Sequence, residues 1–159
     1  MKNAILVSLA KQRWAIELGW VSDVITLGHV TIVPKAPAVI YGVINLGGAL
    51  VPVIDILKLS STTQISKKNS CSGDYTRESL LSNIAILLQV ESVRIALRID
   101  AVIEVETLRD VESRWVDSTG VSAQLIDPAQ LIEDIRINID GEINSGINQL
   151  LNRSESRDR

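Results

Sequence analysis

Acidic side chains are the residues in this sequence best suited to do chemistry. Six carboxylates recur near the ends of the expected strands: Asp23, Asp55, Asp100, Glu104, Glu106 and Asp127. Two neighbouring carboxyl groups, one of them protonated, form the machinery of glycoside hydrolases. Carboxylates in such places also cap turns and keep one face of a sheet in water. A small β-barrel hydrolase that depends on carboxylates is therefore one hypothesis, set against a protein that works by binding.

Nucleophiles and metal ligands are scarce. His29 is the single histidine and Cys71 the single cysteine, so they assemble neither a catalytic triad nor a tetrahedral metal site. The sequence has no dinucleotide fingerprint and no P-loop lysine motif. We therefore expect no catalytic residue, no metal and no cofactor, and we expect that the protein is not an enzyme.

Charge and composition narrow the class of partner. The 159 residues are 46% hydrophobic and 22% charged, which is typical of a globular protein, and the net charge is -3. A nucleic-acid-binding protein would normally carry a basic face, so we expect no nucleic acid. Asn45, Pro52 and Asp55 interrupt the longest apolar stretch, which argues against direct membrane insertion. A lone cysteine suits a reducing compartment, so we expect a cytoplasmic protein.

The elements that must position any site are mainly strands. The chain has 21 Ile and 16 Val, and β-branched residues favour strands. Short strands are predicted at 4–10, 13–18 and 29–34. Between the last two, Val21, Val24 and Ile25 have a helical spacing that predicts a helical turn.

A hairpin is predicted in the stretch VIYGVINLGGALVPVIDIL. Gly47-Gly48 separates two apolar runs, at about 39–46 and 49–54, as in a two-residue turn. Pro52 cannot donate to a strand ladder, so it belongs at an edge or a bulge. Gly42 inside a strand indicates a bend or a close approach by another chain.

The second half repeats the strand pattern and ends in a helix. Strands at 84–90 and 93–100 are joined at Glu91-Ser92, and the second alternates apolar and polar residues. Asp127 and Pro128 suit the N-cap and first position of a helix. After Gly141 we expect a weak helix that frays.

The hairpin stretch also resembles the signature of the CheW family, G-V-x-N-L-R-G-x-x-x-P-V-x-D-L. The positions that match this signature are Gly42, Val43, Asn45, Leu46, Gly48, Pro52, Val53 and Asp55. Upstream, Val21-Ser22-Asp23-Val24 is similar to the family's V-x-E-V turn. Downstream, 102–105 is similar to its V-x-x-V turn. The resemblance covers about residues 4–132.

This resemblance implies an all-β (mainly) fold of two SH3-like five-stranded β-barrel lobes around a shared core, with short helices. Residues 1–135 would form a single domain. Lobe 1 would hold about 13–60, and lobe 2 about 4–10 plus 80–135. The polar stretch 60–79 would be an inter-lobe loop, and 136–159 a C-terminal tail, partly helical or disordered.

The resemblance also implies a role. CheW-like proteins are non-enzymatic adaptors that couple chemoreceptors to a CheA-type histidine kinase in bacterial chemosensory arrays. The partners would be that kinase and the cytoplasmic tip of a chemoreceptor, which would recruit the adaptor to arrays at the inner membrane. The residues implied at the receptor face are Val21, Asp23, Gly42, Val43, Asn45 and Gly47. The remaining motif positions, Leu46, Gly48, Pro52, Val53 and Asp55, would be structural.

One position and one longer segment depart from the family pattern. Gly47 stands where the family has an arginine, whose fork of donors glycine cannot replace. The family's usual further hairpin in the second lobe is replaced by VESRWVDSTGVSAQLID. A divergent adaptor of a type IV pilus or another non-flagellar pathway is therefore a second hypothesis.

Overall fold

The computed structural model describes residues 1–59, 83–112 and 114–155, with side chains as far as residue 143. The stretch 60–79, expected to be an inter-lobe loop, lies outside the described residues. Ten strands lie in the described part of the chain, which makes the protein mainly β: β1 (Lys2–Leu9), β2 (Gln12–Glu17), β3 (Val21–Thr26), β4 (Ile40–Leu46), β5 (Ala49–Ile54), β6 (Ile84–Val90), β7 (Val93–Ile99), β8 (Ala101–Val111), β9 (Arg114–Val116) and β10 (Ser122–Ile126). Two 3-10 turns, η1 (Leu18–Trp20) and η2 (Ile56–Lys58), and one long helix, α1 (Pro128–Glu155), complete these elements.

Five strands close into a barrel in the order β1-β2-β10-β9-β8. β1 pairs antiparallel with β2 on one side and with β8 on the other. β10 runs parallel to β2, and the short β9 joins β10 to the far end of β8. The stretch that replaces the family's further hairpin thus supplies β9 and β10, and the barrel has all five strands.

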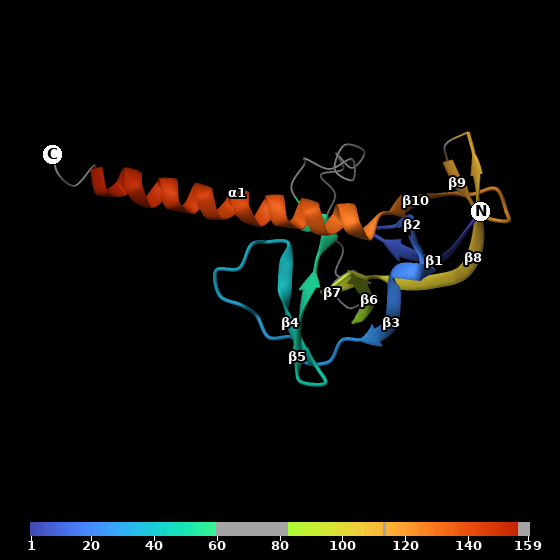
Figure 1. Cartoon of the computed structure of the whole chain (residues 1–159), viewed down its shortest axis with the longest axis horizontal. Coiled ribbons are helices and arrows are strands. Elements are labelled where there is room, and N and C mark those ends of the chain that lie inside the picture. Colours follow the sequence, from blue (N-terminus) through green and yellow to red (C-terminus); the bar gives the residue numbers. More distant parts are fainter. Residues whose placement is uncertain (60–82, 113, 156–159) are drawn as a thin grey trace.

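The other five strands form a sheet in the order β3-β6-β7-β5-β4. β5 pairs parallel with β7 through Val53 and Ile54 only, and β4 and β3 lie at the two edges. Figure 1 shows the sheet below the helix and the barrel beside it.

The predicted division into lobes is wrong in two places. β2 belongs to the barrel with β1, although residues 13–18 were expected in the first lobe. β6 and β7 belong to the sheet with β4 and β5, although residues 80–100 were expected in the second. The strands that precede and follow residues 60–82, β5 and β6, therefore belong to the same sheet.

Two local predictions are also wrong. Residues 21–26 form strand β3, not a helical turn, because their backbone pairs along β6 from Val21–Leu88 to Thr26–Ile84. Residues 29–34 form no strand, and only Thr31 makes an isolated bridge, to Val43. Lys35 has φ of +62°, which breaks the extended course of this segment.

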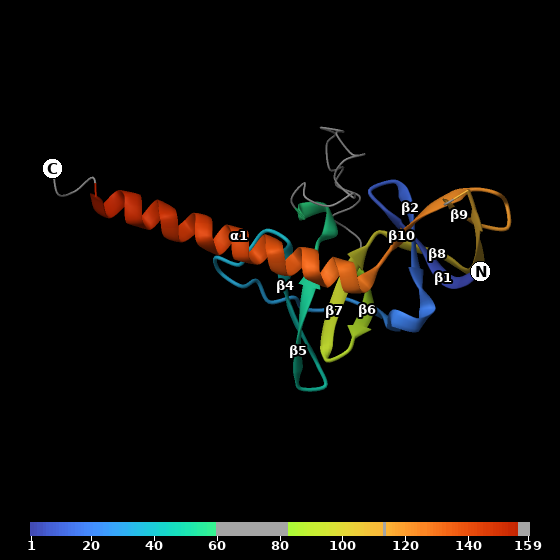
Figure 2. The ribbon, with the colours of Figure 1, turned by 45° about the horizontal axis from the view of Figure 1, so that its top comes forward.

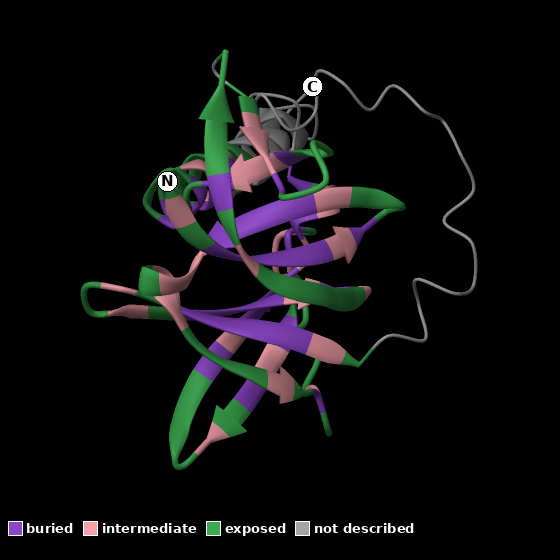
Figure 3. Ribbon diagram, turned by 90° about the vertical axis from the view of Figure 1, so that its right-hand side faces the viewer, coloured by how far each residue is buried: buried purple, intermediate pink, exposed green. Residues whose placement is uncertain are grey.

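The main hydrophobic core lies between the barrel and the sheet. It includes Trp14 and Ile16 of β2, Ile86 and Leu88 of β6, and Leu97 of β7. Figure 3 shows buried residues along the middle of the strands and exposed residues toward their ends. A second, smaller core lies on the other face of the sheet, where Ile44 and Val53 are buried beside Leu27. The β4–β5 hairpin thus contributes to both cores, with Ile54 in the main core and Ile44, Val51 and Val53 in the smaller one.

Helix α1 covers one end of the main core. Asp127 caps it as predicted, since its Oδ1 accepts hydrogen bonds from the backbone N–H groups of Ala129 at 3.0 Å and Gln130 at 3.4 Å. The helix runs for 28 residues and continues through Gly141 to Glu155, so the closing helix and the weak helix expected after Gly141 are one element. Figures 1 and 2 both show it passing the sheet and projecting beyond β4. Within the described residues, no helix combines the length and apolar character needed to cross a membrane.

Candidate functional site

The β4–β5 hairpin is held by its Gly-Gly turn. Gly47 and Gly48 have φ of +59° and +90°, the left-handed region that glycine adopts without strain. The side chain of Asn45 accepts a hydrogen bond from the backbone N–H of Gly48 at 2.8 Å. Asn45 was predicted to contact a receptor, and in the structure its Oδ1 also stabilises the turn.

One face of this hairpin is directed away from the smaller core. Val43 lies opposite Pro52, and Asn45 lies opposite Leu50, so these four side chains share a face. Leu50 is 73% exposed. We call these four residues the hairpin surface. The alternate pair Ile44 and Val51 points into the smaller core.

Gly42 lies beside this surface but does not contribute to it. The glycine is buried, and a Cβ atom placed there would lie 2.7 Å from the backbone oxygen of Thr31 and 2.5 Å from Val30 Cγ1. Thr31 and Val43 exchange two backbone hydrogen bonds of 2.9 Å. The close approach predicted from the glycine is real, but it is made by the chain's own segment rather than by another chain.

The two remaining predicted contacts, Val21 and Asp23, lie on β3. This strand is at the opposite edge of the sheet from β4, so the structure does not gather all six predicted receptor residues on one strand pair. Asp23 is exposed, and its Oδ1 accepts a hydrogen bond from the N–H of Val24 at 2.7 Å. Val24 is itself exposed, which adds an apolar side chain to this edge.

Strand β8 carries an exposed apolar group that the predicted site residues did not include. Val102, Ile103 and Val105 are all exposed, the last at 60%. Ile103 has no partner on β1, because Leu6 pairs with Glu104 and Val7 with Val102, which makes a β-bulge. Among the described strands, only β9 reaches the other edge of β8, at 109–111. We call Val102, Ile103 and Val105 the β8 surface; the V-x-x-V pattern at 102–105 was its signal in the sequence.

The motif residues predicted to be structural stabilise the hairpin through burial and through the hydrogen bond at its end. Val53 is fully buried and Leu46 packs against the same small core. Pro52 lies just before the two residues of β5 that pair with β7, so its missing N–H breaks no ladder there. Asp55 ends the hairpin, and its Oδ1 accepts a hydrogen bond from the N–H of Leu57 at 3.1 Å at the start of η2.

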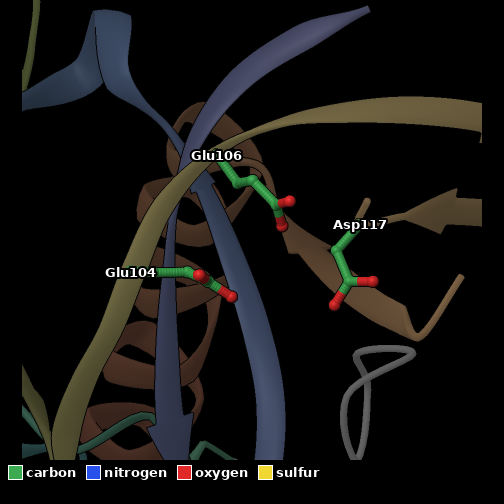
Figure 4. Close-up of side chains that lie close together, drawn as sticks. All are labelled: Glu104, Glu106 and Asp117. Atoms are coloured by element: carbon green, nitrogen blue, oxygen red, sulfur yellow. The ribbon is translucent and has the colours of Figure 1, made fainter. Parts of the chain in front are cut away.

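Three carboxylates converge inside one end of the barrel. Glu104, Glu106 and Asp117 each bring a carboxylate oxygen within 4.8 Å of the other two, and Figure 4 shows them converging from β8 and from the segment after β9. Arg13 donates to Asp117 Oδ2 at 2.7 Å and lies 3.7 Å from Glu104 Oε1. The protein therefore supplies its own positive charge to this cluster. Asp117 was missing from the predicted carboxylates, because its partners come from distant strands.

Asp117 is held as an ion. Its carboxyl is 1% exposed, and the Thr119 hydroxyl donates to it at 2.6 Å. That hydrogen bond lowers the pKa of Asp117, as do the N–H groups of Val121 and Thr119 and the charge of Arg13, against burial, which raises it. A hydrolytic general acid needs a raised pKa, so this shift has the opposite sign. Of the other candidates, Asp55 and Asp100 each accept a backbone hydrogen bond at a separate turn.

Comparison with known proteins agrees with this architecture. The family model described as CheW-like domain matches residues 3–136. A protein named Chemotaxis protein CheW from Rhizobium meliloti (strain 1021) is 27% identical over 109 residues, which are 69% of this chain and 63% of that protein's length. The crystal structure of the scaffolding protein TtCheW from Thermoanaerobacter tengcongensis superposes with a TM-score of 0.55 at 24% identity, over 79% of this chain and 84% of that one.

Proposed function

The chain belongs to the CheW-like domain family, and from this membership we propose that it is a non-enzymatic adaptor that couples chemoreceptors to a CheA-type histidine kinase in a chemosensory array. The observation that carries the proposal is the family match over residues 3–136, which spans both the barrel and the sheet. The adaptor would work in the cytoplasm, recruited to receptor arrays at the inner membrane.

The exposed apolar strands supply the surfaces that such an adaptor needs. The hairpin surface and the β8 surface lie on different lobes, so two partners can be held at once. Neither surface is large, and weak single contacts of this kind gain strength when many copies bind in an array. We assign receptor contact to the hairpin surface together with Val21 and Asp23 of β3, and we add the β8 surface as a contact on the second lobe.

Co-purification with a cognate CheA-type kinase and receptor signalling tip tests the proposal. Val43→Asp should abolish recovery of a partner, because it places a charge in the middle of the hairpin surface while its backbone pairs stay in place. Val121→Asp is the matched control, since Val121 is also exposed but lies outside both surfaces. Equal recovery by wild type and Val43→Asp would contradict the site. Failure of the wild type to bind either partner would contradict the function.

Glycine at position 47, where the family has arginine, favours the second hypothesis, that the chain is a divergent adaptor such as one that serves a type IV pilus. A Cβ atom at Gly47 meets nothing within 4 Å, so the family's arginine would fit at the tip of the hairpin and is not excluded by packing. Gly47 has φ of +59°, which strains a residue with a Cβ atom, so Gly47→Arg should fold with a somewhat lower stability and add a charge at this surface. If the variant gains binding to a flagellar-type receptor tip that the wild type does not bind, the glycine sets partner choice. Unchanged partners in both pathways would contradict this second candidate.

A further inference from the structure

One edge of β8 has no pairing strand over much of its length. β1 pairs with β8 along the first edge, between Ala101 and Leu108, and β9 pairs with the second edge only at 109–111. Within the described residues, no strand or turn supplies a backbone hydrogen bond to the second edge at 101–106. Residues 101–105 are all exposed. We call residues 101–106 the β8 edge. Unpaired backbone groups at a strand edge are a template for another strand.

The two faces of the β8 edge differ in character. Glu104 lies opposite Leu6 in the ladder with β1, on the face that lines the barrel. Glu106 follows on the same face, whereas Val105 lies on the other face with the rest of the β8 surface. A strand added to this edge would therefore meet apolar side chains on one face and carboxylates on the other.

The carboxylates beside the β8 edge carry more negative charge than the chain neutralises. Glu104, Glu106 and Asp117 converge there (Figure 4), and within the described residues Arg13 alone forms salt bridges with them, to Glu104 and Asp117. The Glu104 side chain is 52% exposed, so its charge is open to solvent. The Oε2 atom of Glu106 is buried, and no group of the described residues donates to it. This face of the edge is therefore suited to a further cation.

We propose that the β8 edge binds an extended segment of another protein as an added strand, and that this segment alternates apolar residues with lysine or arginine. Residues directly opposite one another in a ladder share a face. A basic residue opposite Glu104 would meet the carboxylates, and its neighbours on either side would pack on the β8 surface. Main-chain hydrogen bonds supply affinity in this mode of binding, and the alternate side chains supply specificity. The inference rests on the proposed function, in which the β8 surface is a contact, and adds how a partner is held there.

The charge of the β8 edge argues against a second copy of this chain as the partner. Pairing of β8 with another β8 would bring Glu104 and Glu106 of the two copies together, and like charges on facing strands are destabilising. Charges that point inward from a strand edge protect proteins against this kind of self-pairing. Among the described strands, β7 has the required pattern, with Arg94 and Arg98 between apolar residues, but it lies between β6 and β5 within the sheet. We therefore assign the added strand to a different protein.

Binding of labelled synthetic peptides to the full chain, followed by fluorescence anisotropy, tests the β8 edge. The probe is a peptide of about eight residues in which valine and lysine alternate. It should bind about tenfold or more tightly than the peptide with glutamate in place of lysine. The same valine–lysine peptide with every backbone nitrogen methylated keeps its charges but cannot donate to a ladder, and it should lose binding.

Hydrogen exchange of the bound chain locates the contact, because an added strand should slow exchange of the backbone amides at 101–106. The proposal is overturned if the valine–lysine peptide does not bind, if the methylated peptide binds equally well, or if exchange at 101–106 is unchanged.

A charge reversal tests the role of the carboxylates. Glu104→Lys should reverse the preference, so that the valine–glutamate peptide binds more tightly than the valine–lysine peptide. Glu104→Gln, which adds no charge beside Arg13, should lower the preference without reversing it. Glu91→Lys is the matched control, because it makes the same change of net charge at an exposed turn, at the opposite end of β7 from β8. Equal effects of Glu104→Lys and Glu91→Lys would show a general attraction to an acidic protein and would overturn the proposal.

Two features of the design keep the results distinct. Urea unfolding of each variant separates a loss of folding from a loss of binding. The peptide assays use neither kinase nor receptor tip, so their failure overturns the added strand and leaves the proposed function in place. Failure of the wild type to recover a kinase or receptor, with peptide binding and protection at 101–106 intact, contradicts the proposed function and leaves the added strand in place.

Discussion

Gly42 occupies a point where two segments of the chain approach more closely than a side chain would allow. Its position on β4 faces the backbone of Thr31, which pairs with Val43 next to it. The segment between β3 and β4 is otherwise without regular pairing, so this contact ties it to the edge of the sheet. A glycine is required here by the packing of one chain, whether or not a partner also binds nearby.

Gly42→Ala should therefore destabilise the fold. The added Cβ atom would lie 2.7 Å from a backbone oxygen, which must move and strain the Thr31–Val43 bridge. Overpacking of this kind costs typically about 1–3 kcal/mol, measured as the free energy of unfolding in urea. Gly28→Ala is the control, because a Cβ atom at Gly28 meets nothing within 4 Å. Equal stabilities of the two variants would show that the segment moves aside freely.

Asp117 should make stability depend on pH. Its pKa is lowered in the folded protein, so it binds a proton less readily there than in the unfolded chain. Its stabilising contribution is fully present above about pH 4, the ordinary value, and is lost as the pH falls through the folded pKa. Asp117→Asn should lower the unfolding free energy at neutral pH, and the gap to wild type should narrow in acid.

Urea unfolding at a series of pH values measures this gap. Asp110→Asn, which removes an exposed carboxylate on β8, serves as the comparison. A gap between Asp117→Asn and wild type that stays constant down to the most acidic pH would show that the charge of Asp117 is not its source.

The β4–β5 hairpin depends on two glycines in different ways. Gly47 has φ of +59°, which asparagine also tolerates, whereas Gly48 has φ of +90°, which is harder for any residue with a Cβ atom. Gly48→Ala should destabilise the protein by about 1–3 kcal/mol. Gly47→Asn should change stability by less than about 0.5 kcal/mol. Thermal unfolding measures the stability of both variants. Equal losses of stability in Gly48→Ala and Gly47→Asn would contradict this account of the turn.

Elements with a strong local signal were predictable from the sequence. The Gly-Gly turn gave the β4–β5 hairpin within a residue at each end, and alternation along Val93–Ile99 gave β7. Asp127 and Pro128 gave the start of α1. Strand β3 was not predictable in this way, because a spacing of Val21, Val24 and Ile25 also fits a helix. Its extended form is fixed by pairing with β6, some 60 residues away in the sequence.

At the scale of the whole molecule, the missing information is which strands pair. Nothing local in β2 shows that Trp14 joins the barrel, since its partner Gln124 is more than a hundred residues away in the sequence. The candidate site shares this limit. Motif positions on the hairpin were found from the family signature, whereas the convergence of Arg13 and Asp117 required the closed barrel.

The first turns of α1 hold the barrel and the sheet together, and the rest of the helix does not. Leu131, Ile132 and Ile135 are buried in the core between the two lobes. Burial of three such side chains contributes at most roughly 5–9 kcal/mol. That is comparable with the whole stability of a typical domain, about 5–15 kcal/mol. A chain that ends at Asp127 should therefore fail to unfold cooperatively in urea.

A chain that ends at Ile143 should keep the stability of the full chain, measured at a concentration too low for association. It retains the buried part of α1 and loses, among the described residues, only the part of the helix that projects beyond the body. If the shorter chain, ending at Asp127, still unfolds in one cooperative transition near the wild-type midpoint, the lobes hold together without the helix. If removal of residues 144–159 already costs several kcal/mol in dilute solution, the C-terminal part of α1 contributes to the stability of its own domain.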